Sequence, residues 1–145
     1  MRRLFARFFM LLTLAAIAGA ACAKTVPVPA ADAKKVRAVI EAQLDAFAAD
    51  DAQRAFSYAA PAIRQIFGTP ENFIRMVRTG YPVVYRPASV IFLKPERVDG
   101  TLVQGVQMTD SAGEVWLAVY IMERQRDKSW RINGCQVAES AGRAV

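Results

Sequence analysis

The sequence predicts an α+β fold in which helices come first and pack on an antiparallel sheet formed by the second half of the chain. Before Gly80, apolar residues recur every three or four positions, as on the buried face of a helix. After Gly80, segments rich in Val, Ile and aromatic residues follow one another, as in strands. Short turn sequences such as Asp99-Gly100 separate these segments, which favours antiparallel neighbours. With 145 residues, the chain is too short for two ordinary domains.

Residues 1–23 have the three parts of a secretory signal peptide. Three arginines form a basic start, Phe8–Ala18 is an apolar run, and Ala21-Cys22-Ala23 fits the small-residue cleavage pattern. The apolar run is about half as long as a membrane-spanning helix requires. We therefore expect cleavage after Ala23 and a periplasmic or secreted protein that meets a membrane only through its signal segment. The alternatives are a lipoprotein modified at Cys22 and an uncleaved anchor.

A single domain is predicted over residues 31–138, between an extended leader and a short tail. Pro27 and Pro29 favour an extended backbone for the leader, residues 24–30, and residues 139–145 form the tail. Three of the 19 basic side chains and none of the 13 acidic ones lie in residues 1–23, so the rest of the chain has a net charge of +3. A charge so close to neutral gives little support to nucleic-acid binding, and no nucleic-acid partner is expected.

The first predicted helix covers residues 31–49. Its apolar positions recur at steps of four, four and three, and they are Val36, Ile40, Leu44 and Phe47. Asp50 and Asp51 follow, and either is a suitable N-cap for a short helix that carries Phe56 and Tyr58.

Two prolines mark the starts of the next two helices. Pro61 suits a first helical turn, and this helix ends at Gly68. Thr69 is a good N-cap with Pro70 at the first helical position, and the second of these helices ends at Gly80. The buried apolar residues expected in the first helix are Ile63, Ile66 and Phe67, and those in the second are Phe73, Ile74, Met76 and Val77.

Strands are predicted after residue 80. Residues 81–87 are expected to be extended, because Pro82 and Pro87 cannot serve a central strand. The four predicted strands are Ser89–Lys94, Thr101–Thr109, Glu114–Arg124 and Ser129–Ala138. In the last strand, Trp130 and Ile132 would lie on one face of a regular strand, and Cys135 and Val137 on the other. We expect a bulge at Asn133-Gly134, which would bring both pairs to the same face.

The strand Glu114–Arg124 is apolar on both faces, which predicts a partner for the sheet. One face has Val115, Leu117, Val119 and Ile121, and the other has Trp116, Ala118, Tyr120 and Met122. The helices precede the sheet and can cover one face only, so we expect a homodimer that buries the second face. We take Tyr120 as the residue whose replacement by Glu would break the pairing. The alternative is that the C-terminal tail or Lys24–Ala31 wraps over this face.

The sequence excludes several chemistries and assigns no catalytic residue. It has no His and only two Cys, which excludes His-based triads and Cys-rich zinc modules. It has no Gly-rich phosphate loop and no acidic cluster with metal-ligand spacing, so no metal and no cofactor are predicted. Glu123 is the only acid near a strand interior, and we expect it to form a solvated ion pair with Arg124. Asp110 and Glu114 are interpreted as turn residues, and Cys135 as a buried, inert thiol.

One short stretch combines cationic and aromatic side chains, and it is the predicted ligand-binding site. Its residues are Arg75, Arg78, Tyr81, Tyr85 and Arg86. Guanidinium groups and tyrosine hydroxyls together can hold a carboxylate or phosphate by charge-assisted hydrogen bonds, so a small anionic ligand is expected. The alternative is that the arginines line an exposed helix face while the tyrosines cap the core.

Several phrases of the sequence resemble DUF4864, a bacterial family of domains of unknown function. They are Ile40–Phe47, Phe67–Glu71, Val84–Pro87 and Trp130–Cys135. The order of helices and strands also resembles the nuclear transport factor two-like superfamily, which includes ketosteroid isomerase. That resemblance implies a cone in which helices pack on a curved four-stranded antiparallel sheet with a pocket between them. It implies no activity, because the superfamily includes enzymes, binding modules and scaffolds.

Two functions follow from these expectations. The first is an exported, non-catalytic module that binds a small ligand or a protein partner. The second is an isomerase- or hydratase-type enzyme that uses a pocket carboxylate and tyrosine hydroxyls. A buried acid within hydrogen-bond reach of a tyrosine would favour the enzyme, whereas a pocket lined by apolar groups and arginine would favour the module.

The signal pattern generates a direct prediction. Because all three parts of the pattern are present in order, we expect the protein isolated from the periplasmic fraction to begin at Lys24. Intact-mass measurement checks this. A mass that retains residues 1–23, or one that includes diacylglycerol on Cys22, would contradict the prediction.

Overall fold

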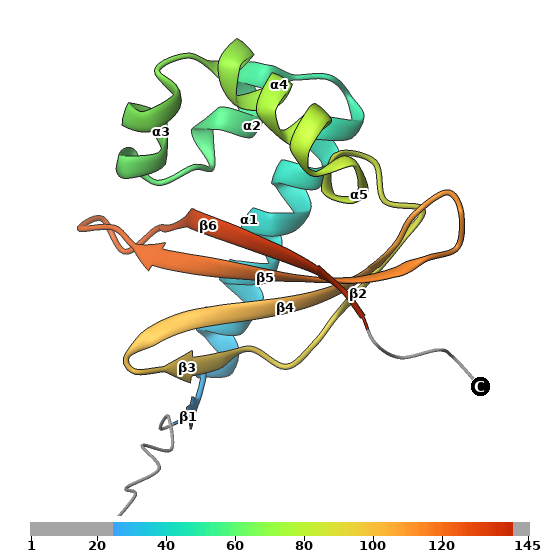
Figure 1. Ribbon diagram of the computed structural model, residues 1–145. Coiled ribbons are helices and arrows are strands. Elements are labelled where there is room, and N and C mark those ends of the chain that lie inside the picture. Colours follow the sequence, from blue (N-terminus) through green and yellow to red (C-terminus); the bar gives the residue numbers. More distant parts are fainter. Residues whose placement is uncertain (1–24, 141–145) are drawn as a thin grey trace, which may run out of the picture.

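The computed structural model describes residues 25–140, in which helices pack on one face of a six-stranded antiparallel sheet (Figure 1). The helices are α1 (Ala30–Ala48), α2 (Ala52–Ser57), α3 (Pro61–Phe67), α4 (Pro70–Gly80) and α5 (Pro82–Tyr85). The strands are β1 (Thr25–Pro27), β2 (Ser89–Phe92), β3 (Glu96–Val98), β4 (Thr101–Thr109), β5 (Val115–Arg124) and β6 (Trp130–Glu139). The predicted signal peptide lies outside the described residues, as do residues 141–145 of the predicted tail. None of the helices within residues 25–140 has the length and hydropathy needed to cross a bilayer.

The predicted helix starts are confirmed by their caps. Asp51 accepts a hydrogen bond from the backbone N–H of Arg54 at 3.0 Å, and this bond begins α2. Thr69 Oγ1 accepts from the N–H of Asn72 at 3.2 Å, and Pro70 occupies the first position of α4. Such caps satisfy backbone donors that the first helical turn leaves free. They explain why short segments with little propensity of their own begin where the sequence predicts.

Two predictions about the helical half are wrong. Pro82–Tyr85 is the short helix α5 rather than an extended segment. Pro82 begins it, and the buried side chains of Val83 and Val84 hold it against the core, so packing overrides the strand propensity of valine. Ile66 was expected to be buried, but 72% of its surface is exposed, because α3 turns its Ile63 and Phe67 side towards the protein.

The antiparallel order is confirmed for the four predicted strands, but the sheet has six strands rather than four. β4 pairs with β5 along one edge and with both β2 and β3 along the other. β3 is only three residues long and contains two charged residues, so it has no apolar pattern from which to predict a strand. Residues 25–27 of the predicted leader form β1, which pairs with β3 at the edge of the sheet.

The predicted bulge is confirmed in β6. Ile121 pairs with Gly134 and Met122 with Ile132, so Asn133 is the extra residue. The shift brings Cys135 opposite Tyr120, and both side chains face the helices. Without the extra residue, the residues after position 133 would face the opposite side of the sheet.

The inner face of the sheet and the stripe on α1 form the core. In Figure 1, α1 passes behind the sheet and α2 to α5 gather at one end. The predicted stripe is buried in full, from Val36 to Phe47. Tyr120 is 1% exposed on this helix-covered face, so it is the wrong residue with which to probe pairing of the sheet. The uncovered face is the one that has Leu117, Val119 and Ile121.

Candidate ligand-binding cavity

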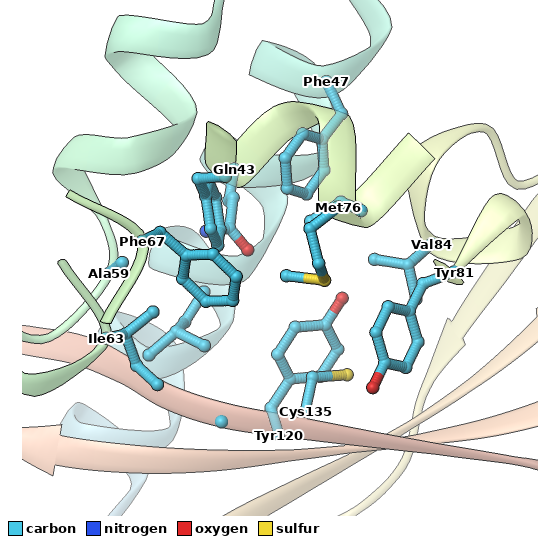
Figure 2. Close-up of a pocket in the computed structure, with 14 residues that line it drawn as sticks. Gln43, Phe47, Ala59, Ile63, Phe67, Met76, Tyr81, Val84, Tyr120 and Cys135 are labelled. Carbon is cyan, nitrogen blue, oxygen red and sulfur yellow. The ribbon is translucent and has the colours of Figure 1, made fainter. Parts of the chain in front are cut away.

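A cavity of about 230 Å³ lies between the helices and the inner face of the sheet (Figure 2). Most of its wall is hydrocarbon, and six side chains provide much of that wall: Phe47, Ile63, Phe67, Phe73, Met76 and Val84. Four side chains bring polar atoms: Gln43, Tyr81, Tyr120 and Cys135. The cavity therefore suits an apolar molecule with few polar groups.

The spacing of residues in the sequence directs these side chains to one place. Gln43 and Phe47 are four apart on α1, so both lie on the same face of that helix. Phe73 and Met76 are three apart on α4, and they project into the same cavity. The sheet contributes Tyr120 from β5, next to β6 with its bulge. Residues distant in the sequence therefore meet in one cavity, because the helical spacing of three or four residues directs each pair to one face of its helix.

Aromatic packing and backbone pairing hold the walls in position. The Phe73 ring lies 5.6 Å from that of Phe67 and 6.1 Å from that of Phe47, measured between centroids. The backbone N–H of Ile132 donates to Tyr58 O at 2.9 Å, and that of Ala60 donates to Ile132 O at 2.8 Å. These two bonds attach the link between α2 and α3 to β6, beside the cavity. The cavity is thus built on both a rigid sheet and a helical layer fastened to it.

The polar groups of the cavity are neutral, and one of them has no partner. Gln43 Nε2 donates to Ala55 O at 3.1 Å, which uses that group to tie α1 to α2. Tyr120 Oη is buried and has no hydrogen-bond partner among the described residues. Burial raises the pKa of Tyr120 well above its ordinary value of 10.0, and the neighbouring Cys135 adds to this effect. Burial also raises the pKa of the Cys135 thiol to about 12.

A wider groove lies beside this cavity, between α5 and the turn that joins β4 to β5. Its volume is about 640 Å³, and Tyr81 lines both spaces. Asp110 lies in this groove, where it accepts from Trp116 Nε1 at 2.9 Å and from the backbone N–H of Glu114 at 3.0 Å. These hydrogen bonds, led by that of Trp116, lower the pKa of Asp110. Its predicted role as a turn residue is confirmed, since its oxygens are used within the turn.

Three of the five predicted ligand-binding residues gather on a carboxylate of the chain itself. Arg86 Nη2 lies 3.0 Å from Asp50 Oδ2, and Arg78 Nη2 lies 3.5 Å from Oδ1. The Tyr85 hydroxyl donates to Oδ1 as well, and both guanidinium groups lie over the Tyr85 ring. Binding of an external carboxylate or phosphate here stays a prediction, and such a ligand would have to displace Asp50.

The other two members of that group lie elsewhere. Arg75 Nη1 reaches Asn72 Oδ1, 3.5 Å away on the preceding turn of α4. Tyr81 lines both the apolar cavity and the wider groove, and in that groove it is joined by Tyr85 and Arg86.

Glu123 lies on the face of the sheet away from the cavity. Gln125 Nε2 donates to its Oε1 at 3.1 Å, and the part of the chain that the structure describes has no ion pair between Glu123 and Arg124. Within residues 25–140 no group of three or more acidic or Cys side chains could hold a metal ion.

From the sequence, Tyr120 was expected on the face that pairs with a second copy, and its place in the cavity was missed. The available signal was the bulge, because it sets Cys135 opposite Tyr120 on the helix-covered face of the sheet, where the Tyr120 hydroxyl is buried. Which helix residues stand opposite that hydroxyl depends on how the helices cross the sheet, and a single sequence does not contain that information.

A family model with the description "Domain of unknown function (DUF4864)" matches residues 29–145. No curated protein and no solved structure matches the chain.

Burial of the Cys135 thiol predicts a loss of stability in alkali. Because its pKa rises from 9.0 to about 12 on folding, this contribution to stability is complete below pH 9 and is lost between pH 9 and about 12. Between pH 8.5 and 10, we expect the free energy of unfolding to fall by about 1 kcal/mol more in the wild type than in Cys135→Ala. Urea unfolding at each pH measures it. Parallel pH profiles of the two proteins would show that the thiol is not buried.

Proposed function

The chain belongs to the DUF4864 family, and we propose that it is a non-catalytic binding module that takes up a small, largely apolar molecule between its helices and its sheet. The observation that carries this proposal is the cavity of about 230 Å³ with hydrocarbon walls. An apolar cavity of roughly 150 Å³ holds benzene, so one of this size accommodates a molecule of roughly ten non-hydrogen atoms. The ligand gains affinity mainly by removing apolar surface from water.

The composition of the cavity wall favours a binding module over an enzyme. An isomerase or hydratase of the kind expected from the sequence needs a carboxylate beside the substrate. None of the residues that line the cavity is acidic. The Cys135 thiol, with its pKa of about 12, holds its proton at neutral pH and is a poor nucleophile.

Two further parts of the proposal concern fold family and compartment. The cavity between helices and an antiparallel sheet supports membership in the nuclear transport factor two-like superfamily with its cone-shaped fold. The signal pattern of residues 1–23 supports export, with the module acting in the periplasm or outside the cell. Lipidation at Cys22 is the alternative, and it would tether the same module to a membrane.

Blocking the cavity tests the proposal. We expect naphthalene to bind the wild type with a Kd on the order of 0.1 mM. Ile63→Trp places a large ring in the cavity wall and should weaken binding by at least about tenfold. Ile66→Trp is the matched control, because Ile66 lies on the same helix but is 72% exposed. Titration followed by NMR chemical shifts measures all three proteins.

The outcomes of this titration are distinct. Weakening by Ile63→Trp alone supports the cavity as the site. Equal binding by both variants, or no binding by the wild type, contradicts the proposal.

A second candidate function is pairing with another copy of this chain through the uncovered face of the sheet. Leu117, Val119 and Ile121 lie at the centre of this face, and it continues onto Ile91, which is 57% exposed, and Leu93, which is 43% exposed. Residues 25–27 do not cover the face, because they pair at the edge as β1. An apolar surface of this kind on a soluble domain is commonly an interface.

The charges of this face favour a second copy as its partner. In a two-fold pairing the same patch meets itself, so an unpaired charge near its centre would repel its equivalent. Glu123 and Arg131, at one end of the face, are direct neighbours across β5 and β6 and balance one another, and the charged Glu96 lies away from the centre, at the β3 edge. Self-association therefore brings no like charges together at the centre.

Sedimentation velocity at micromolar concentration measures the pairing. We expect a dimer for the wild type and a monomer for Val119→Glu, because a carboxylate at the centre would be buried against its copy. Ile66→Glu is the control, since Ile66 lies on the helical side, and it should stay dimeric. A wild type that sediments as a monomer contradicts the pairing.

A further inference from the structure

The unpartnered hydroxyl of Tyr120 indicates which ligand the cavity takes. Two buried side-chain polar atoms of the described residues have no hydrogen-bond partner, Tyr120 Oη and Trp130 Nε1, and of these two residues Tyr120 lines the cavity. Leaving a buried donor unpaired costs about 1–3 kcal/mol. Figure 2 shows the Tyr120 ring rising from the sheet with its hydroxyl directed towards the helices and Met76. A ligand atom that pairs with this hydroxyl would remove that cost.

The wall of the cavity excludes a charged ligand group. No residue that lines it has a charged side chain, and Arg78 and Arg86 are engaged with Asp50 outside it. Transfer of an ion into such surroundings without a counter-charge is strongly unfavourable. The molecule that fits is therefore neutral.

The group that Tyr120 needs is a hydrogen-bond acceptor. Its phenol keeps the proton at neutral pH, because burial raises its pKa, and a protonated phenol can donate. The Cys135 sulfur beside it is a weak acceptor, so this contact leaves the hydroxyl without a strong hydrogen-bond partner. Tyr81, the other tyrosine of the cavity, is only half-buried, so water can satisfy its hydroxyl.

A ligand reaches this hydroxyl by moving a flexible neighbour. Tyr120 Oη has almost no surface open to water without a ligand, whereas Met76 on the opposite wall is half-buried. Met76 has an unbranched side chain with several rotatable bonds, so it can change rotamer at little cost. Its displacement gives an acceptor on the ligand access to the phenolic hydrogen.

We infer that the ligand is a neutral, mainly hydrocarbon molecule of roughly ten non-hydrogen atoms with one acceptor oxygen, such as a ketone, that accepts a hydrogen bond from Tyr120 Oη. This inference rests on the proposed function, because it names the class of molecule that the same cavity binds.

A pair of isosteric probes separates the inference from the proposal beneath it. Acetophenone and α-methylstyrene have the same shape, but the first has a carbonyl oxygen where the second has a methylidene carbon. Their Kd values are measured by NMR titration of the full chain in the wild type, in Tyr120→Phe and in Tyr81→Phe. For each protein, the Kd of acetophenone is divided by that of α-methylstyrene, and this ratio is then compared between each variant and the wild type. The hydration of the free probes is the same in every titration, so it cancels in this comparison.

We expect the Kd of acetophenone relative to that of α-methylstyrene to rise about tenfold in Tyr120→Phe. In Tyr81→Phe, the matched control, the ratio should stay within about twofold of the wild type. Without ligand, Tyr120→Phe should melt at the same temperature as the wild type or higher, because it removes an unpaired buried hydroxyl.

Any other result contradicts either the inference alone or both the inference and the proposed function. If both probes bind the wild type and the ratio is unchanged in Tyr120→Phe, the inference fails and the proposed function stands. A lower melting temperature of Tyr120→Phe also overturns the inference, since it would mean that the hydroxyl has a partner in the free protein. If the wild type binds neither probe, both the proposed function and the inference fail.

Discussion

The single extra residue in β6 is the constraint on which the rest of the structure depends. Side chains alternate between the two faces of a strand, so a shift by one residue exchanges the faces. The bulge at Asn133 lets Trp130 and Cys135 face the helices together, although five positions separate them. Without it, either the start or the end of β6 would present its polar side to the core. Asn133 has no pairing partner in β5, and in exchange both halves of β6 contribute apolar side chains to the face that the helices cover.

The cavity follows from how the helical layer is attached to that strand. Backbone bonds on either side of Ile132 fasten the link between α2 and α3 to the sheet. Just after the C-terminal end of α1, Asp50 connects the helical layer to Tyr85 and Arg86 at the end of α5. The Phe73 ring packs on Phe47 and Phe67, so aromatic contacts join α4 to α1 and α3 and fix the helical wall of the cavity.

Local chemistry made much of the fold predictable, whereas tertiary packing decided what was missed. Asp51 and Thr69 cap their helices by bonds to residues three positions ahead, and such bonds can be read from a single sequence. The helix Pro82–Tyr85 could not be predicted from local sequence, because its two valines favour a strand. The segment is helical only because these valines are buried against the core. In the candidate site, too, local features were predictable and tertiary contacts were not. The cationic and aromatic cluster was visible in the sequence, but its internal partner, Asp50, lies 36 residues from Arg86.

The contrast between these two regions explains why charge was a poor guide to the cavity. Arginine and tyrosine groups near the surface are readily satisfied by the chain, and half-exposed ion pairs of this kind are worth only about 1 kcal/mol each. A buried hydroxyl has fewer alternatives, because it cannot turn to water and the strand's own carbonyls are used in the ladder. An unsatisfied neutral group inside a cavity therefore says more about a ligand than a satisfied cluster of charges at the surface. Natural structures leave few such groups, and in this chain Tyr120 is one that also faces a space large enough to hold a molecule.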